Sequence, residues 1–221
     1  MNVFSMVYRE LFETLMRDPR YNVNFACRGL QMAKEMLSAR IDMDISEAGV
    51  CVFSHPTHRV VPIRFILAEL AFILAGRKDL AVMMSYNKGM AKYSNDGSTL
   101  GGSYGDRLRG QLDAIIDKLN NDPYTRQACG VIFQKMDMLD STRVHIPCNV
   151  FIQFLYRKPV LSMHVTSRSS DFVTGFSIDT VHWQFLLKYL SLDLWFVDAP
   201  KLRLFYNLAS LHIYAADIPI I

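Results

Sequence analysis

The sequence predicts an α/β (α+β) protein with one large mixed sheet and flanking helices. Segments with apolar residues at three- and four-residue spacing, typical of amphipathic helices, alternate with β-rich runs. No linker, internal repeat or low-complexity segment separates them. The 221 residues, 51% hydrophobic and only 20% charged, suffice for one large core. We therefore expect a single domain over residues 1–221.

We expect four helices. Residues 2–17 and 108–119 have the spacing of amphipathic helices, residues 62–75 form a mostly apolar run typical of a buried helix, and residues 180–190 follow Asp179. Asp18-Pro19 ends the first of them, because a proline disfavours helical backbone in the residue before it. Gly76 ends the apolar run, which opens at Pro62, the usual arrangement of these two residue types at helix ends.

The β-rich runs cover residues 128–133, 148–156, 160–167 and 202–214, and we expect less regular strands and turns within 23–53. Residues 94–105 contain Ser, Asn, Asp and four glycines. They predict a loop long enough to suggest a function.

Composition excludes several classes of protein. The net charge of +3 is too small and too evenly spread for a dedicated nucleic-acid binder. No signal peptide is recognisable, and no stretch approaches 18 uncharged apolar residues, so we expect no membrane span. The four cysteines are Cys27, Cys51, Cys129 and Cys148, and their spacing is not that of metal ligands. We therefore expect no metal site, no disulfide framework and a cytoplasmic protein.

Cys148 is the candidate nucleophile. The β-rich runs 148–156 and 160–167 are joined by a turn. If this turn is centred on Lys158, two residues lie opposite each other when their numbers add up to 316, so Cys148 lies opposite Arg168. A neighbouring guanidinium favours the reactive thiolate. Composition alone also allows an inert, buried cysteine beside an exposed arginine. Alternation would put the thiol on one face with the polar side chains of Ser162, His164 and Thr166.

These residues lie in motifs that resemble the thymidylate synthase superfamily. Pro147–Phe154 is similar to the strand that carries the nucleophile, and Ser167–Gly175 contains the pattern Arg-Ser-x-Asp-x-x-x-Gly. Further segments resemble other landmarks of the family in the same order, from about residue 6 to 214: Ala68–Leu74, Tyr104-Gly105, Asp122–Arg126 and Ser210–Tyr214. The likeness is greatest to phage-type deoxycytidylate hydroxymethylases.

The resemblance implies a three-layer fold, and a homodimer that joins sheet to sheet and shares its active sites. It also implies one-carbon transfer from 5,10-methylenetetrahydrofolate to C5 of a pyrimidine nucleotide, after Cys148 adds to C6. Water then gives a hydroxymethyl group, whereas hydride from the folate gives a methyl group.

The same motifs imply roles for other residues. Glu69 would order water and shuttle protons, and Tyr104 would assist removal of the C5 proton; a solvated helix Glu and a packed loop Tyr are the plainer interpretations. Arg126 would reach into the partner subunit. The remaining nucleotide-binding candidates are Arg28, Arg168 and Ser169 for phosphate, Ser170 and Asp171 in the same signature, and His212 and Tyr214 for the sugar 3′-hydroxyl.

Asp179, four residues after Gly175, is expected to select the base. Thymidylate synthases have an Asn there, which pairs with uracil, whereas a carboxyl group suits the inverted donor and acceptor pattern of cytosine. Asp179 is also a good N-cap for the helix that follows. Asn149 replaces the His that is common after the nucleophile, Gln127 replaces a second Arg, and no Trp precedes Tyr104 in its segment, which favours hydration.

We therefore expect dCMP to be converted to 5-hydroxymethyl-dCMP in the cytoplasm, the host cytoplasm if a phage encodes the chain. Reductive methylation of dCMP or of dUMP, and hydroxymethylation of CMP, stay open. A non-catalytic nucleotide-binding homologue is the alternative from another class.

Overall fold

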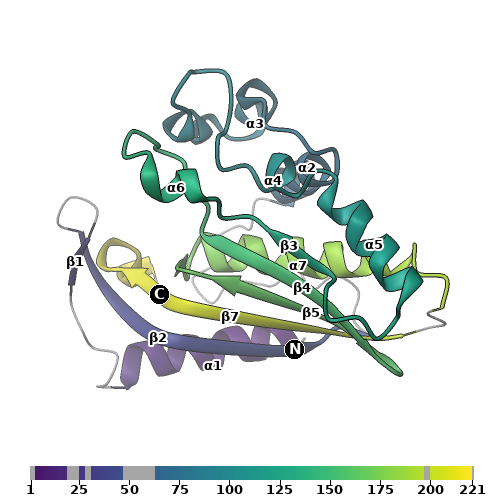
Figure 1. Cartoon of the computed structure of the whole chain (residues 1–221). Helices are drawn as coiled ribbons and strands as arrows, with labels where there is room; N and C mark the ends of the chain where they lie inside the picture. Colours follow the sequence, from purple (N-terminus) through teal and green to yellow (C-terminus); the bar gives the residue numbers. More distant parts are fainter. Residues whose placement is uncertain (1–2, 19–24, 28–30, 47–62, 197–199, 221) are drawn as a thin grey trace.

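A computed structural model describes residues 3–18, 25–27, 31–46, 63–196 and 200–220. The expected mixed sheet forms its base (Figure 1). Along the sheet the strand order is β1-β2-β7-β5-β4-β3, and β6 pairs with β7 beside this path. The pairs of β5 and β6 with β7 are parallel, and the other pairs are antiparallel. The strands are β1 Phe25–Cys27, β2 Gln31–Asp44, β3 Cys129–Val131, β4 Asn149–Arg157, β5 Val160–Ser167, β6 Ser170–Asp171 and β7 Lys201–Tyr214.

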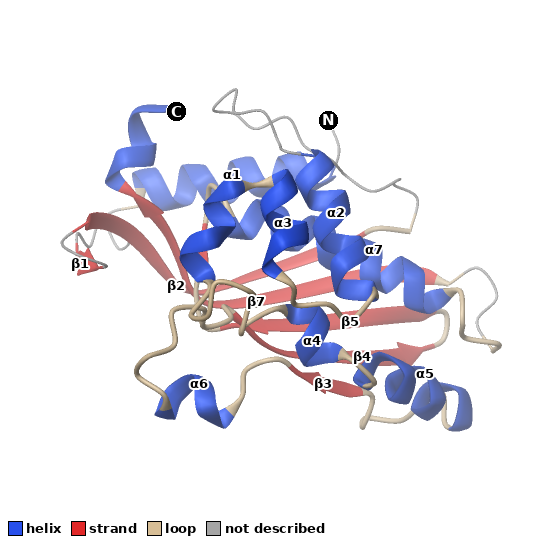
Figure 2. Cartoon of the chain, turned by 90° about the horizontal axis from the view of Figure 1, so that it is seen from above, coloured by secondary structure: helices blue, strands red, loops and turns tan. Residues whose placement is uncertain are grey.

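The longer helices lie over one face of the sheet (Figure 2). Helix α7 packs on β5 and β7, and α2 packs on α7, so that sheet, α7 and the group of α2, α3 and α4 form three successive layers (Figure 1). The helices are α1 Val3–Arg17, α2 Ile63–Leu74, α3 Leu80–Tyr86, α4 Tyr104–Leu108, α5 Gln111–Asn121, α6 Lys135–Leu139 and α7 Gly175–Ser191, with 3₁₀ helices η2 Lys88–Tyr93 and η3 Ala215–Ile220.

The main core lies between the sheet and α7. Alternate residues of β5, such as Met163 and Val165, are fully buried under α7, as period-two alternation requires. Trp183 and Phe176 of α7 fill the space above them, and Phe176 stacks on Tyr206 of β7. This packing makes α7 and the sheet a rigid support for polar side chains at their common edge.

Most expected elements are confirmed, with two differences in helix boundaries. The segment 108–119 is divided, because Gly110 adopts a φ of +71° that ends α4 before α5 begins. Helix α7 begins at Gly175 with Thr174 at its N-cap, so the interpretation of Asp179 as an N-cap is wrong. Asp179 lies in the second turn of α7 and is buried.

The predicted pairing of Cys148 with Arg168 is confirmed, for a different reason. In most of the hairpin the pair numbers add up to 317, as in Ile152 with Val165. A bulge between Asn149 and Phe151 then shifts the register by one. The backbone N–H of Arg168 consequently donates to the carbonyl oxygen of Cys148 at 2.9 Å.

The bulge also changes the face of the sheet on which Cys148, just before β4, lies. Cys148 borders the same cavity as Asp179 of α7. His164 instead stacks on Phe205, in the row that alternates with the buried residues facing α7. The expectation that Cys148 shares a face with Ser162, His164 and Thr166 is therefore wrong, because the bulge interrupts strict alternation.

Candidate active site

A cavity of about 900 Å³ opens where α2, η2 and α7 meet the ends of β4, β6 and β7. Its size falls within the range of small-molecule sites. Nine expected site residues lie along its wall together with Asp179: Glu69, Tyr104, Cys148, Arg168, Ser169, Ser170, Asp171, His212 and Tyr214. Arg126 is exposed just before β3, outside this wall. Arg28 lies outside the described residues.

Cys148 lies beside a fixed cation. Nη2 of Arg168 is 4.0 Å and Oγ of Ser169 is 3.9 Å from its sulfur. The guanidinium itself is held by the carbonyl oxygens of Pro147 and Ile146, at 3.0 and 3.1 Å. Arg168 therefore has a fixed position with one edge toward the thiol and the cavity, as a group that binds an anion and favours a thiolate requires.

Ser170 and Asp171 shape the start of α7. The carboxylate of Asp171 accepts from the backbone N–H of Val173 at 2.9 Å and from Oγ1 of Thr174 at 2.5 Å. Ser170 is buried, and a Cβ on Gly175 would lie 3.3 Å from its Oγ, so a glycine fits best there. The Arg-Ser-x-Asp-x-x-x-Gly motif thus folds into a turn that places Arg168 and α7 around one cavity.

A hydrogen-bonded group surrounds Asp179. Nδ2 of Asn149 donates to Oδ2 of Asp179 at 2.7 Å and to the hydroxyl oxygen of Tyr104 at 2.8 Å. The hydroxyl of Tyr206 donates to Oδ1 of Asn149 at 2.8 Å. Burial raises the pKa of Asp179 to about 6, although its hydrogen bonds oppose this. Burial, and then the charge of Asp179, also raise the pKa of Tyr104 well above its ordinary value.

Glu69 of α2 lines the same cavity as Asp179. Burial, and secondly the nearby Asp179, raise the pKa of Glu69 to about 8, so its carboxyl group holds a proton at neutral pH. Nε2 of His182 lies 3.7 Å from Oε2 of Glu69. The same nitrogen donates to the carbonyl oxygen of Ile66 at 3.0 Å. Burial lowers the pKa of His182 to about 4, which keeps its imidazole neutral.

His212 and Tyr214 extend the cavity at the end of β7. Their rings meet edge to face at 5.1 Å between centroids. The N–H of Phe172 donates to the carbonyl oxygen of His212 at 2.7 Å, which ties this strand end to the Arg-Ser-x-Asp-x-x-x-Gly motif. The two side chains are thereby placed at the opposite end of the motif from Cys148.

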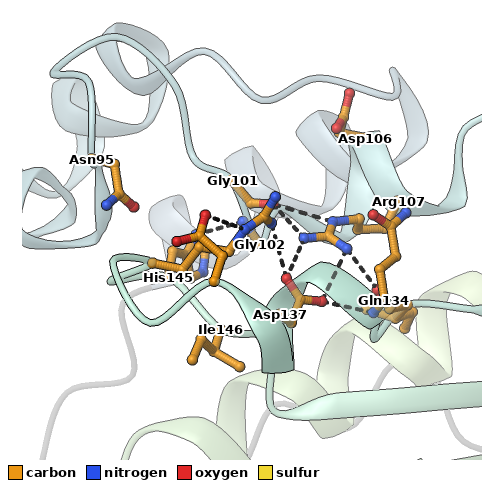
Figure 3. Close-up of polar contacts among 12 residues, drawn as sticks. Asn95, Gly101, Gly102, Asp106, Arg107, Gln134, Asp137, His145 and Ile146 are labelled. Atoms are coloured by element: carbon orange, nitrogen blue, oxygen red, sulfur yellow. Dashed lines mark hydrogen bonds and ion pairs between the residues drawn. The ribbon is translucent and has the colours of Figure 1, made fainter.

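A buried ion pair supports the loop that leads to Tyr104 (Figure 3). Nη2 of Arg107 lies 2.7 Å from Oδ1 of Asp137, and the same guanidinium donates to the carbonyl oxygen of Gly101 at 2.7 Å. The N–H of Gly102 donates to Nδ1 of His145 at 3.2 Å. Burial, and secondly Arg107, lower the pKa of His145 to about 4, so the ring accepts this bond in its neutral form.

The sequence interpretation missed two of these residues and gave a third no role. Tyr206 is the polar position in the buried row of β7 that includes Leu204 and Leu208, and such an interruption is a usable signal. His182 follows Asp179 by three residues and so shares its face of α7. Asn149 appeared only as a departure from a motif.

Two further observations concern only the described residues. They contain no group of three or more His, Cys, Asp or Glu that could hold a metal ion. Among them, no helix has both the length and the apolar character needed to cross a membrane.

Comparison with known proteins identifies the family of the chain. The family model described as thymidylate synthase matches residues 7–221. The chain belongs to the thymidylate synthase family. It is 31% identical over 171 residues to a deoxyuridylate hydroxymethyltransferase of Bacillus phage SP01, an alignment that covers 69% of the chain and 44% of that relative.

A second relative, a deoxyuridylate hydroxymethyltransferase of Pseudomonas phage M6, is 30% identical over 136 residues, covering 58% of the chain and 38% of the relative. The chain therefore aligns with less than half the length of either relative. Membership of the thymidylate synthase family and the phage source of these relatives agree with the resemblance inferred from the motifs.

Proposed function

We propose that the protein transfers a one-carbon unit from 5,10-methylenetetrahydrofolate to C5 of dCMP and that the product is 5-hydroxymethyl-dCMP. The observation that carries this proposal is the carboxyl group of Asp179 at the cavity wall, held by Asn149. Cytosine offers an N4 amino donor and an N3 acceptor. A carboxyl group that accepts with one oxygen and donates with the other matches both.

Cys148 supplies the nucleophile in this proposal. Its thiolate forms a bond to C6 of the pyrimidine, which makes C5 electron-rich enough to attack an electrophilic carbon. Arg168, 4.0 Å from the sulfur, stabilises the thiolate and the nucleotide phosphate together. His212 and Tyr214 would bind the sugar at the far end of the cavity.

The cavity also has room for a folate beside the nucleotide. Phe65, Tyr86, Tyr93 and Lys92 also line it, and flat aromatic rings next to a cation suit a pterin and its acidic tail. When bound, 5,10-methylenetetrahydrofolate supplies a carbon at the oxidation level of formaldehyde and departs as tetrahydrofolate.

Glu69 and Tyr104 then carry the proton steps. Tyr104, at the cavity wall, would assist removal of the C5 proton, and Glu69 would order the water whose oxygen becomes the hydroxyl group. The thiolate leaves C6 at the end, so dCMP, methylenetetrahydrofolate and water give 5-hydroxymethyl-dCMP and tetrahydrofolate. With hydride instead of water the product would be 5-methyl-dCMP and dihydrofolate.

The homodimer is part of the same proposal. On β4 the residues that alternate with the buried row, such as Phe151 and Leu155, are only partly buried on the face away from α7. These two apolar side chains alternate with Gln153 and Arg157, and an open sheet face with such partly exposed apolar side chains suits a second copy of the sheet. The carbonyl oxygen of Arg126 accepts from Nε2 of Gln153 at 2.8 Å, and the residue lies outside its own cavity, as expected for a residue that serves the partner's site.

Mixing two inactive variants tests the shared site. Subunits with Cys148→Ser keep Arg126, and subunits with Arg126→Ala keep Cys148. If the sites are shared, mixed dimers contain one intact site and regain activity, whereas separate sites would leave the mixture inactive.

A second candidate is hydroxymethylation of dUMP. It is favoured by the two phage relatives, whose names specify deoxyuridylate. A neutral carboxyl group can also pair with uracil if its proton lies on the other oxygen, so Asp179 does not by itself exclude this base.

A mass-resolved product assay tests the proposal. The enzyme is incubated with methylenetetrahydrofolate and dCMP, dUMP or CMP in parallel, and both nucleotide and folate products are identified. Addition of CH₂O to dCMP with release of tetrahydrofolate is the expected result. Addition of CH₂ with dihydrofolate would replace hydroxymethylation by methylation, and turnover of dUMP alone would favour the second candidate.

A further inference from the structure

We propose that Asn149 is a positioning residue for base selection: by donating to Oδ2 of Asp179 it confines the proton of that carboxyl group to Oδ1, and so determines which base the group can pair with. The inference rests on the proposed function of the site. It assigns a role to a residue that does not itself need to contact the nucleotide.

The contacts of Asn149 use the whole of its amide. Its side chain is fully buried, and its Nδ2 donates both hydrogens, to Oδ2 of Asp179 at 2.7 Å and to the hydroxyl of Tyr104 at 2.8 Å. Its Oδ1 accepts from the hydroxyl of Tyr206 at 2.8 Å. An asparagine amide can donate two hydrogens from nitrogen, so no donor is left over.

The neighbours fix the direction of the amide. Turning it over would bring Oδ1 of Asn149 against a carboxylate oxygen, and two acceptors without a hydrogen between them repel each other in a buried site. In the observed direction, Tyr206 must be the donor to Asn149, and the oxygen of Tyr104 must be an acceptor. The hydroxyl hydrogen of Tyr104 is therefore not used by Asn149 and can serve the hydrogen bond that Tyr104 forms with Asp179.

The same bonds make the two oxygens of Asp179 unequal. Oδ2 accepts from Asn149 and lies 3.4 Å from the hydroxyl of Tyr206, so it is turned toward the sheet and serves as an acceptor. A proton on the other lone pair of Oδ2 would weaken the bond that Oδ2 accepts from Asn149, because a protonated carboxyl oxygen is a poorer acceptor than the unprotonated one. When the carboxyl group is neutral, its hydrogen is consequently placed on Oδ1.

This placement decides between the bases. In the proposed pose N3 of the base lies against Oδ1 of Asp179. The hydrogen on Oδ1 can be donated only to an N3 that carries no hydrogen, as in cytosine, and Oδ2 can then accept from the N4 amino group. Uracil in the same pose would bring its N3 hydrogen against the hydrogen on Oδ1. If the carboxyl proton could move to Oδ2, uracil would fit instead, so loss of the Asn149 donor should relax selection.

Asn149→Asp tests the donor directly, because it keeps the shape of the side chain and removes both N–H groups. Two facing carboxyl groups share a proton, which would lie on the Oδ2 side of Asp179. We expect the ratio of kcat/KM for dCMP to that for dUMP to fall at least about tenfold, the effect of one hydrogen bond of about 1.4 kcal/mol. Asn149→Ala should lower the same ratio.

Asn120→Asp is the matched control. Asn120 also uses both the nitrogen and the oxygen of its amide, donating to the carbonyl oxygen of Asp193 at 3.1 Å and accepting from the N–H of Trp195 at 3.2 Å, but it does not line the cavity. Its ratio should equal that of the wild type. Thermal unfolding of every variant shows which of them fold.

The ratio separates positioning from structural support. If Asn149 only supports the structure, its variants lose activity toward both bases equally and the ratio stays unchanged, which would overturn the inference. Should Asn149→Ala not fold, the isosteric Asn149→Asp decides alone. If wild-type enzyme prefers dUMP, the dCMP proposal fails, but a changed ratio in the variants would still support the role of Asn149.

Discussion

Nη2 of Arg168 lies 4.0 Å from Sγ of Cys148, on the far side of the bulge that interrupts β4. The same guanidinium donates to two carbonyl oxygens of the segment before Cys148, at residues 146 and 147. Arg168 thus holds the segment before Cys148 in place and leaves a cation beside both the thiol and the cavity, where it would stabilise a thiolate.

Replacement of Cys148 should stop chemistry at its first step. Cys148→Ser replaces a thiol by a hydroxyl with a far higher pKa, so C6 is not attacked and C5 does not become acidic. We expect exchange of the C5 hydrogen of dCMP with solvent to fall below detection, as measured by deuterium incorporation. Cys129→Ser, at a half-buried cysteine outside the cavity, is the control and should exchange normally. Continued exchange in Cys148→Ser would remove this residue as the nucleophile.

Replacement of Asp179 should change the preferred base. Asp179→Asn presents an amide that accepts from N3–H and donates to O4 of uracil, and it leaves N4 of cytosine facing a donor. We expect the ratio of kcat/KM for dCMP to that for dUMP to fall by about 100-fold or more. Asp193→Asn, at an exposed site after α7, should leave the ratio unaltered. Equal ratios in both variants would show that Asp179 does not select the base.

The raised pKa of Glu69 predicts a pH-dependent cost in stability. Because its pKa rises from 4.5 to about 8 on folding, the folded protein holds this proton more tightly than the unfolded chain. The contribution of Glu69 to stability is therefore full below about pH 4.5 and is lost as the pH rises toward 8. Between pH 5 and pH 8, Glu69→Gln should gain on the order of 2 kcal/mol in unfolding free energy relative to wild type.

Urea unfolding followed by tryptophan fluorescence at several pH values measures this difference. The pKa of Asp179 is also raised, but this residue is present in both Glu69→Gln and the wild type, so its titration does not produce the difference in stability between them. Glu13→Gln, at an exposed carboxylate of α1, is the control and should show no such trend. A difference between Glu69→Gln and wild type that does not change with pH would contradict the assignment.

The ion pair behind the loop of residues 94–103 should be worth more than an exposed pair. Arg107→Ala leaves the buried Asp137 with one cation fewer and should cost about 3–5 kcal/mol of unfolding free energy. Arg77→Ala, which removes an exposed pair with Asp79, should cost less than about 1 kcal/mol. Similar losses in the two variants, measured by chemical denaturation, would show that the buried pair has no special role.

The sequence predicts the strands and helices well where the apolar periodicity agrees with the Pro and Gly residues at the ends of the elements. Residues 160–167 alternate cleanly and form β5 with those bounds, and the segment that opens at Pro62 forms α2. The start of α7 was misplaced because its first turn, after Gly175, carries no strong helix signal. The bulge in β4 depends on tertiary packing and leaves no mark in a local pattern.

The candidate site was predicted chiefly through motifs. They bring Glu69, Cys148, Arg168 and Asp179 to one cavity, as expected. Asn149 and Tyr206 could not be placed in the same way, because their role depends on a bulge and on pairing between strands far apart in the sequence. Polar residues inside buried rows are the signal that a single sequence still offers.

Trapping of a covalent complex tests the central claim most directly. A fluorine at C5 cannot leave as a cation, so 5-fluoro-dCMP should stop the reaction after the one-carbon unit has joined C5. We predict an intact-protein mass increased by 5-fluoro-dCMP plus methylenetetrahydrofolate, located on the peptide that contains Cys148. An adduct with 5-fluoro-dUMP alone, or no adduct with either nucleotide, would contradict it.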